Sequence, residues 1–481
     1  MKSEECILHF VREKACVPRA RLTEMTDSGI PDARVPGPGS RSSVQMNPHH
    51  ALFVTFHVPP EASSSGVLRT LKYVRYLDDL GWRVTLVSIS VSAYEATDPA
   101  LEAQLPASCR IIRTRYLNTK RHLSLARRYP AILALPDVWI GWLPWAVAAA
   151  RRLFLSDPFE LVYSTSPPAT AHLIAQRIAR RTRVPWVADF RDPWFEVPPE
   201  PGAPNGPLFR RLDRMLERKV VESCDAVVTT TADLCDMLAQ RYPKQPASKF
   251  TAILNGYDEA DFAALPREET RADAPLVIVH SGTINAEFRN PIPFFAAVHR
   301  CIDAGVIEPN RLRVKFLGGG SFAAAPGLQA TVKRLGLEEI VEFVPRLPYA
   351  ESLREVARAD LLLLLQSSPD TSGLVPAKLY EYLRAGKPVI ALVPQGATQQ
   401  ILSVVGGGEA IAPEDSEGLY HVVAENFRRW ALGTLSDNRA DFAALRRYDR
   451  RALTAELARL FEELLARTTT LPPESRTSSV R

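Results

Sequence analysis

Short apolar runs alternate with amphipathic segments along most of this chain, and this alternation restricts the fold more than any other feature. The run from Ala51 to Val58 predicts a strand. From Val67 to Leu80, apolar residues recur at helical spacing until Gly81 ends the pattern. Further strands are expected at Arg83 to Ile89, Cys109 to Thr114, Leu161 to Thr165, Pro185 to Phe190, Ala226 to Thr230 and Phe250 to Leu254. Such alternation is typical of a parallel sheet with helices on both faces.

The same pattern starts again in the second half of the chain. Asp360 to Leu365 contains an unbroken leucine run, as expected for a strand that helices cover on both faces. The other strands of this half are expected at Leu276 to Ser281, Leu312 to Leu317, Ile340 to Val344, Lys387 to Val393 and Glu409 to Pro413. The sequence therefore predicts an α/β protein with two Rossmann-like, doubly wound parallel-sheet domains that face a cleft, where the strand ends bind ligands.

This pattern divides the chain into parts. Residues 1–45 have mixed charge and no apolar period, so we expect a disordered extension, and Met46 is a candidate for the true start. Residues 46–258 form the first Rossmann-like domain and 259–438 the second. A C-terminal helix is expected over 439–466, and the sequence leaves open whether it returns to the first domain. Residues 467–481 are rich in Thr, Ser and Pro and predict a disordered tail.

Charge and cysteine content narrow the class of protein. The 481 residues include 59 Lys and Arg against 54 Asp and Glu, a net charge of +5, which is far from a dedicated nucleic-acid binder. The 6 cysteines form no Cys-x-x-Cys pair, which favours reduced thiols in a cytoplasmic protein. The N-terminus shows no secretory pattern, and the apolar stretch from Val138 to Ala150 is too short for a membrane span.

The loop after the first expected strand is suited to an anion. It runs from Pro59 to Gly66 through three serines, and Arg69 follows inside the helix. Small residues let a ligand approach the backbone, and a helix N-terminus attracts negative charge. Gly66 and Arg69 are therefore candidate binding residues. The alternative is an ordinary turn between a strand and a helix.

Charged residues also follow the strand that ends at Phe190. Asp189, Arg191 and Asp192 lie where an open α/β sheet binds its ligands, which makes them candidate catalytic residues. Asp192 or Asp189 could contact an acceptor hydroxyl as a general base. The alternative is an Asp–Arg ion pair that braces a loop.

The second half carries two candidate binding segments. Gly282 and Thr283 can donate hydrogen bonds after the first strand of this half, and Arg289 can supply charge to a diphosphate. The alternative for Arg289 is a solvated loop arginine.

The other segment is a helix expected to start near Val375. It contributes Pro376, Lys378 and Glu381, of which the last two share one helix face. The carboxylate can accept both hydroxyls of a ribose, and the ammonium can balance phosphate charge. The alternative is a surface Lys–Glu pair.

Two further patterns are weak. Gly318 to Ala323 fits a loose G-x-G-x-x-A dinucleotide fingerprint, but Pro326 and Gly327 would shorten any following helix. The histidines, among them His49, His50 and His57, show no ligand spacing, and the chain has no Asp-x-Asp triplet. A metal site is therefore not predicted.

Taken together, these segments resemble the GT-B glycosyltransferases of the family 4 (group 1) type, from Ala51 to the C-terminal helices. The markers are the Ser63 to Arg69 loop, Ser164 to Pro168, Ala188 to Trp194, Ile253 to Asp258 and Lys378 to Leu383. The resemblance implies metal-independent transfer of a hexosyl or N-acetylhexosaminyl group from a nucleotide-diphosphate sugar, with no other cofactor. The donor would lie mainly on the second domain and the acceptor on the first.

The resemblance also implies roles for individual residues. Glu381 would bind the ribose, while Arg289 and Lys378 would hold the diphosphate and stabilise the leaving nucleotide in place of a metal. Asn255 to Asp258 would mark the crossing between the domains. One departure matters: the family's motif has a first Glu that touches the donor sugar, and Gly373 stands there. The histidine often found near the catalytic loop of the first domain is not evident either.

The acceptor is predicted from a basic segment. No acidic residue occurs between Ala103 and Pro136, while Trp139, Trp142 and Trp145 follow at helical spacing. Such a surface can lie against anionic lipid headgroups, which predicts peripheral membrane contact and a glycan or lipid-linked acceptor in cell-surface polysaccharide biosynthesis. The alternative is a solvated loop beside a helix with buried tryptophans. The basic residues are Arg110, Arg113, Arg115, Lys120, Arg121, Arg127 and Arg128.

Two other functions compete with sugar transfer. Nucleotide-sugar 2-epimerases share the architecture and act on the donor without an acceptor. A non-catalytic GT-B subunit that binds a partner enzyme is the third possibility, because the first Glu of the motif is absent.

Overall fold

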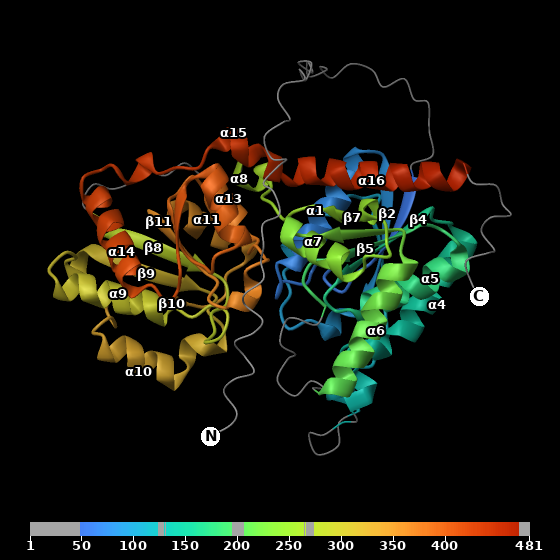
Figure 1. The fold of residues 1–481 in the computed structure, drawn as a ribbon, viewed down its shortest axis with the longest axis horizontal. Coiled ribbons are helices and arrows are strands. Elements are labelled where there is room, and N and C mark those ends of the chain that lie inside the picture. The colour runs from blue at the N-terminus through green and yellow to red at the C-terminus, as the bar shows by residue number, and fades with distance from the viewer. Residues whose placement is uncertain are drawn as a thin grey trace. The chain divides into compact units, whose positions relative to one another are not determined.

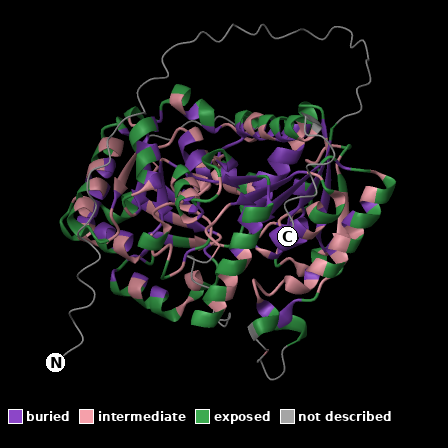
Figure 2. Cartoon of the chain, turned by 45° about the vertical axis from the view of Figure 1, so that its right-hand side comes forward, coloured by how far each residue is buried: buried purple, intermediate pink, exposed green. Residues whose placement is uncertain are grey.

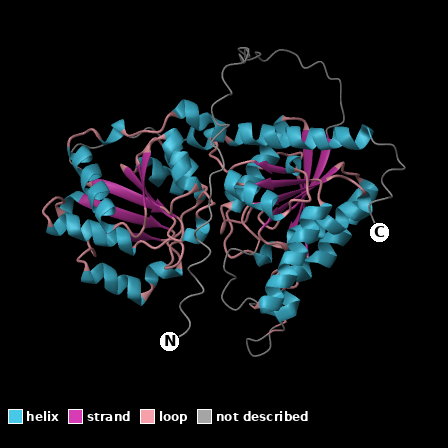
Figure 3. Cartoon of the chain, viewed as in Figure 1, coloured by secondary structure: helices cyan, strands magenta, loops and turns pink. Residues whose placement is uncertain are grey.

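The computed structural model describes residues 49–123, 129, 131–194, 206–263, 265 and 274–470. They form two parallel sheets flanked by helices (Figure 3), as predicted. The first sheet has the order β3-β2-β1-β4-β5-β6-β7 and the second the order β10-β9-β8-β11-β12-β13. The first contains β1 (His49–Val54), β2 (Trp82–Ile89), β3 (Arg110–Thr114), β4 (Leu161–Ser166), β5 (Trp186–Phe190), β6 (Ala226–Thr229) and β7 (Phe250–Ala252). The second contains β8 (Leu276–Ser281), β9 (Leu312–Leu317), β10 (Val341–Val344), β11 (Leu361–Leu365), β12 (Val389–Leu392) and β13 (Gly408–Ile411).

Helices connect most of the strands. Those of the first part are α1 (Gly66–Asp79), α2 (Pro99–Glu102), α3 (Thr119–His122), α4 (Leu143–Ser156), α5 (Thr170–Thr182), α6 (Pro207–Ser223), α7 (Ala232–Arg241) and α8 (Glu259–Ala263). Those of the second part are α9 (Ile292–Asp303), α10 (Pro326–Arg334), α11 (Tyr349–Arg358), α12 (Lys378–Arg384), α13 (Ala397–Val405), α14 (Ser416–Ala431) and α15 (Phe442–Leu445), and the last helix is α16 (Arg450–Thr470).

Alternate side chains of each strand enter two different cores. In β1, Leu52 and Val54 pack with α4 and α5, while Ala51 and Phe53 pack with α1 and α16. The leucine run of β11 divides in the same way, because Leu361, Leu363 and Leu365 face the core of α9, α10 and α14 while the other two leucines face that of α11, α12 and α13. Both sheets are therefore buried on both faces, as Figure 2 shows for the strands.

The last helix completes the core of the first sheet. Figure 1 shows α16 beside α1, although the two are far apart in the sequence. Phe461 of α16 is fully buried and packs its ring against Trp82 at 5.3 Å and Tyr163 at 6.0 Å. The first-domain core thus includes residues from the C-terminal part of the chain.

Two chain segments pair where the chain passes between the sheets. The Tyr257 amide donates to the Tyr448 carbonyl at 3.1 Å, and the Arg450 amide donates to the Tyr257 carbonyl at 2.8 Å. A Cβ on Gly256 would lie 1.9 Å from the Tyr448 carbonyl oxygen. Only glycine fits this close approach of two backbones.

The element ends differ from the predictions in places. Strand β1 ends at Val54, so Thr55 to Val58 belong to the loop. Helix α12 begins at Lys378, after the expected start near Val375. Helix α16 continues to Thr470, past the predicted start of the tail. The predicted extension over 1–45, residues 471–481, most of 264–273, and Arg127 and Arg128 lie outside the described residues.

Candidate functional site

The strand order of each sheet creates one position suited to a ligand. Neighbouring strands β1 and β4 leave connections that run to opposite sides of the first sheet, and β8 and β11 do the same in the second. Ligands of open α/β sheets bind at such points, outside the carboxyl ends of the strands. The loops after β1, β5, β8 and β11 therefore hold the candidate site.

A pocket of about 110 Å³ lies where the chain leaves β1, β4, β5, β6, β7 and β11. It is lined by residues from both sheet domains, so a ligand in it would touch both. The lining residues are Ser64, Ser65, Gly66, Arg69, Pro167, Arg191, Asp192, Thr230, Asn255, Leu374, Val375 and Ala377.

Arg191 is held over Gly66 at the start of α1. Its Nε donates to the Ser166 carbonyl at 2.7 Å, and Nη2 donates to the Pro167 carbonyl at 3.1 Å. A Cβ on Gly66 would lie 1.6 Å from Nη1 of Arg191. The absence of a side chain at Gly66 therefore lets the guanidinium cover the helix N-terminus.

The structure separates the two candidate carboxylates. Asp189 is 0% exposed and accepts from Nε of Arg69 at 3.0 Å, from Nη2 of Arg69 at 3.2 Å, from Thr165 at 3.1 Å, and from the Tyr163 hydroxyl. These bonds make Asp189 an internal brace, which corresponds to the ion-pair alternative. Asp192 is half-buried and lines the pocket, so it is the carboxylate that can reach a ligand.

Arg69 likewise has a mainly structural position. Its guanidinium also donates to the carbonyls of Ile253 and Leu254, both at 2.9 Å, and more weakly to Asn255 at 3.4 Å. All its N–H groups are thus directed at protein acceptors. Arg69 connects α1 and Asp189 to the segment that leaves the first sheet. Its N–H groups are therefore occupied and do not favour a bond to a diphosphate.

Asp192 lies in a strongly charged environment. Burial raises its pKa, while the charges of Arg191, His57 and Arg289 act in the opposite direction. Arg289 comes from the loop after β8, so charged groups of both sheet domains meet here. Its guanidinium is half-buried and makes no hydrogen bond or ion pair with any described residue.

Lys378 sits directly against Gly282. Its ammonium donates to the Ser281 carbonyl, and a Cβ on Gly282 would lie 2.7 Å from Nζ. Burial and the charge of Arg289 lower the pKa of Lys378 to about 7, with Glu381 opposing them. Thr283 is exposed beside this group, and Pro376 accepts the Leu379 amide at 3.0 Å at the start of α12.

Glu381 is half-buried and bound to a neighbouring tyrosine. The Tyr349 hydroxyl lies 3.0 Å from Oε1 of Glu381 and 3.1 Å from Oδ2 of Asp261. Burial raises the pKa of Glu381, while Tyr349 and the charge of Arg450 oppose this. The Tyr349 hydroxyl has one proton for two carboxylates, so its hydrogen bond to Glu381 is shared with Asp261.

The loop at Gly373 contacts the first sheet domain. Its carbonyl accepts from the Thr231 hydroxyl at 2.7 Å, and a Cβ there would lie 3.6 Å from Cβ of Asp233. A glutamate at this position would approach the Asp233 carboxylate, and like charges repel.

The three tryptophans of the predicted membrane surface differ in exposure, because Trp142 is buried while Trp139 and Trp145 are half-buried. Trp142 is 0% exposed and donates to Thr114 at 2.7 Å. Trp139 packs its ring on Phe56 at 4.8 Å, and Trp145 is half-buried. Trp142 therefore corresponds to the alternative of a buried tryptophan, because it lies in the 3-10 turn before α4 and its indole reaches Thr114 of β3.

The loop after β1 contains a polar pair for which the sequence analysis predicts no role. His57 and Glu61 are four residues apart in the loop after β1, and their side chains meet at 3.1 Å. The sequence analysis considers His57 as a metal ligand, whereas its partner in the structure is the carboxylate of Glu61. Their spacing of four residues was the available signal.

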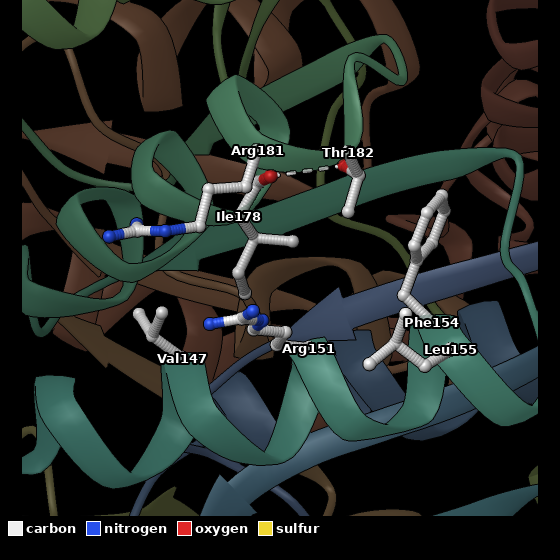
Figure 4. Close-up of a pocket in the computed structure, with 7 residues that line it drawn as sticks. All are labelled: Val147, Arg151, Phe154, Leu155, Ile178, Arg181 and Thr182. Atoms are coloured by element: carbon white, nitrogen blue, oxygen red, sulfur yellow. Dashed lines mark hydrogen bonds between the residues drawn. The ribbon is translucent and has the colours of Figure 1, made fainter.

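A second pocket lies away from these residues, between α4 and α5 (Figure 4). It holds about 180 Å³ and is lined by aliphatic, aromatic and arginine side chains with one threonine. Lacking a carboxylate, histidine or thiol, its lining has no group for acid–base or nucleophilic chemistry.

Three other structural findings concern cofactors and membranes. A 3-10 turn, Ser321–Ala324, follows Gly320 where a dinucleotide fingerprint would start an α-helix. Across the described part of the chain, no cluster of His, Cys, Asp and Glu could hold a metal ion. The described helices include none that is long and apolar enough to cross a membrane.

Part of the chain is similar in sequence to known glycosyltransferases. Residues 66–256 match the family described as "Glycosyl transferase 4-like domain". A D-inositol 3-phosphate glycosyltransferase of Streptomyces griseus is 28% identical over 212 residues, or 40% of this chain. The chain covers 44% of that relative, which is less than half its length.

Solved structures share the fold at low sequence identity. Anabaena HepE in complex with UDP has a TM-score of 0.59 at 15% identity, covering 86% of this chain and 100% of the other. A UDP-N-acetylglucosamine 2-epimerase has a TM-score of 0.50 at 13% identity, covering 88% of this chain and 98% of the other. These likenesses concern the fold alone.

Proposed function

We propose that this chain, whose residues 66–256 match the family described as "Glycosyl transferase 4-like domain", is a GT-B enzyme of the family 4 type that transfers a sugar from a nucleotide-diphosphate sugar to a glycan or lipid-linked acceptor. The donor carries a hexosyl or N-acetylhexosaminyl group, and no metal takes part. The reaction serves cell-surface polysaccharide biosynthesis on the cytoplasmic side. The UDP complex of the related fold supports a nucleotide donor.

The environment of the Arg289 side chain is the main support for this proposal. Its guanidinium is half-buried and forms no hydrogen bond or ion pair with a described residue, and it lies in the field of Asp192 from the other sheet domain. Partial burial removes water from this charge at a cost in free energy, and an anionic ligand would offset that cost. Lys378 adds a second cation close to it. A diphosphate fits this pair of charges.

The proposed chemistry follows from these positions. Asp192 contacts the acceptor hydroxyl at the pocket, while Arg289 and Lys378 hold the diphosphate. The acceptor hydroxyl gives its proton to Asp192, and its oxygen bonds to the anomeric carbon as the bond between that carbon and the phosphate oxygen breaks. The cations stabilise the charge that develops on the leaving diphosphate. Glu381 accepts the ribose hydroxyls after it leaves the Tyr349 hydroxyl.

A donor screen by thermal shift tests the proposal. We expect a uridine or guanosine diphosphate sugar to raise the melting temperature, and Glu381→Ala to abolish this shift. Glu351→Ala is the matched control, because Glu351 is an exposed glutamate on the neighbouring helix α11. Unchanged nucleotide affinity in Glu381→Ala would refute the ribose assignment.

The competing functions give different results in the same assays. An epimerase, whose fold is similar, would exchange a sugar proton with solvent in the absence of any acceptor. A non-catalytic subunit would bind the nucleotide without transfer or hydrolysis. Gly373 stands where the family motif has the Glu that contacts the sugar, and this difference favours the non-catalytic function over an ordinary member of the family.

We propose peripheral membrane contact through the exposed basic residues of the segment between Ala103 and Pro136. Arg113 is turned inward, where it donates to the Tyr94 hydroxyl at 2.6 Å. Among the described residues of the segment, the exposed arginines and lysines are Arg110, Arg115, Lys120 and Arg121. They support contact with anionic headgroups. Flotation with anionic vesicles tests it, and absence of binding would remove the membrane from the proposal.

A further inference from the structure

The pocket between α4 and α5 has a largely apolar lining (Figure 4). Ile178 of α5 is 2% exposed and forms its inner wall, and the Phe154 ring of α4 is half-buried. Leu155 lines the pocket as well, although it is 77% exposed. The Thr182 hydroxyl is already used, because it donates to the Ile178 carbonyl at 3.0 Å. An apolar chain in the pocket would remove surface of Phe154 and Leu155 from water, which favours its binding.

The charged groups of the pocket lie on one side of it. Figure 4 shows the guanidinium groups of Arg151 and Arg181 on the side away from the Phe154 ring. Arg151 makes no hydrogen bond or ion pair with a described residue, and Arg181 donates to the Arg177 carbonyl at 3.2 Å. Within the described part of the chain, neither guanidinium has a carboxylate partner. The lining therefore offers two cations to a ligand at one side and an apolar surface at the other.

The surrounding face of the molecule is basic. Neither α4 nor α5 contains an Asp or Glu. Arg152 and Arg180, the sequence neighbours of the two lining arginines, are exposed as well. Burial lowers the pKa of Arg177, and the charges of Arg181 and Arg180 act in the same direction, as expected where cations are crowded. A face with this excess of cations attracts an anion.

The size of the pocket limits the ligand. Its volume is about 180 Å³. A water molecule takes about 30 Å³ in the liquid, and a methylene group is of similar size, so the pocket holds about six carbons of one chain. The second chain of a diacyl phospholipid would stay outside it. Size and charge together favour a ligand with one acyl chain and one anionic group.

We propose that this pocket is a binding site for a single-chain fatty acid. The chain lies against Phe154, Leu155 and Ile178, and the carboxylate is held by Arg151 and Arg181. A guanidinium and a carboxylate match in geometry and form paired N–H···O bonds. The site shares no lining residue with the pocket of about 110 Å³, so the proposal goes beyond sugar transfer and does not depend on it.

A chain-length series tests the apolar part of the site. Ligand-observed nuclear magnetic resonance measures the affinity of the full chain for butanoate, hexanoate, octanoate and decanoate. We expect affinity to rise about fourfold per methylene from butanoate to hexanoate, because each methylene leaves water. It should change little from octanoate to decanoate, where the pocket is full. A rise that continues unchanged to decanoate would indicate adsorption to an open surface and overturn the proposal.

Paired substitutions test the charged part. Arg151→Gln with Arg181→Gln should weaken decanoate binding at least about tenfold, the effect of losing charge-assisted hydrogen bonds. Arg152→Gln with Arg180→Gln is the matched control, because it removes the same charge from the same two helices outside the lining. All four side chains are exposed, so both variants should fold, and thermal unfolding checks this. Equal loss of affinity in the two variants would reduce the site to diffuse attraction and overturn the proposal.

Two further measurements separate a fatty acid from other ligands. Decanol has the same chain without the charge and should bind at least about tenfold more weakly than decanoate, whereas equal affinity would contradict the role of the arginines. Flotation with phosphatidylglycerol vesicles should be the same in both paired variants. A loss of flotation confined to Arg151→Gln with Arg181→Gln would assign the pocket to a membrane lipid and overturn the fatty-acid assignment. None of these assays contains a nucleotide, so their failure leaves the proposed function untouched.

Discussion

Arg69 and Asp189 form a two-bond ion pair inside the first sheet domain, with Nε–Oδ2 at 3.0 Å and Nη2–Oδ1 at 3.2 Å. Neither side chain is more than 3% exposed. The pair joins helix α1 to the end of β5, directly below the pocket. Removal of one of the two side chains leaves the other as a buried charge without a partner, which costs more free energy than replacing both.

Asp189→Asn should therefore destabilise the fold by about 3–5 kcal/mol, because Arg69 keeps its buried charge. Urea unfolding measures this change. Asp79→Asn is the control, because Asp79 pairs with Arg451 at 3.0 Å on the surface. A surface pair contributes at most about 1 kcal/mol. Equal effects of the two substitutions would show that Asp189 is not the brace described here.

Gly256→Ala should disturb the passage between the sheets. The added Cβ would lie 1.9 Å from a backbone oxygen of Tyr448, which cannot move without shifting its whole segment. We expect a loss of about 1–3 kcal/mol in the free energy of unfolding. Gly327→Ala in α10 has no atom within 4 Å of its new Cβ and should be neutral or stabilising. Thermal unfolding of both variants tests this pair.

UDP binding should weaken as pH rises above 7. Lys378 has its pKa lowered to about 7, so it loses its proton over this range in the free protein. A bound diphosphate favours the charged form, so binding takes up a proton. Linkage then predicts up to about tenfold loss of affinity per pH unit. Calorimetry in buffers of different ionisation enthalpy measures the proton uptake. Lys378→Arg should remove the pH dependence, and a flat wild-type profile between pH 6 and 9 would contradict the assignment.

Arg289→Ala should reduce UDP affinity by about ten- to a hundredfold, the effect of losing one or more charged hydrogen bonds. The side chain has no partner among the described residues, so its removal should cost little folding stability. Arg334→Ala, an exposed arginine at the end of α10, controls for net charge. Equal UDP affinity in both variants would remove Arg289 from the diphosphate site.

The fold could be predicted almost completely from the sequence, because it depends on local periodicity. Strand β8 has the predicted bounds, and the leucine run of β11 is buried on both faces. The site could be predicted only to the level of segments. Asp189 and Asp192 are three residues apart and chemically identical, and only the position of Arg69 in space shows which one is buried. Trp142 has the spacing of an amphipathic surface, yet it is buried and donates a hydrogen bond to Thr114 of β3, a contact between residues 28 positions apart in the sequence.

The contact between α16 and the first sheet has a consequence for how the protein is made. On the ribosome, the strands of that sheet emerge long before Phe461, which fills the space between Trp82 and Tyr163. At usual rates of synthesis the gap is on the order of ten seconds or more. During that interval the α1 side of the sheet lacks its covering helix and exposes aromatic surface. We therefore expect the core of the nascent first domain to stay incomplete until the last helix is synthesised.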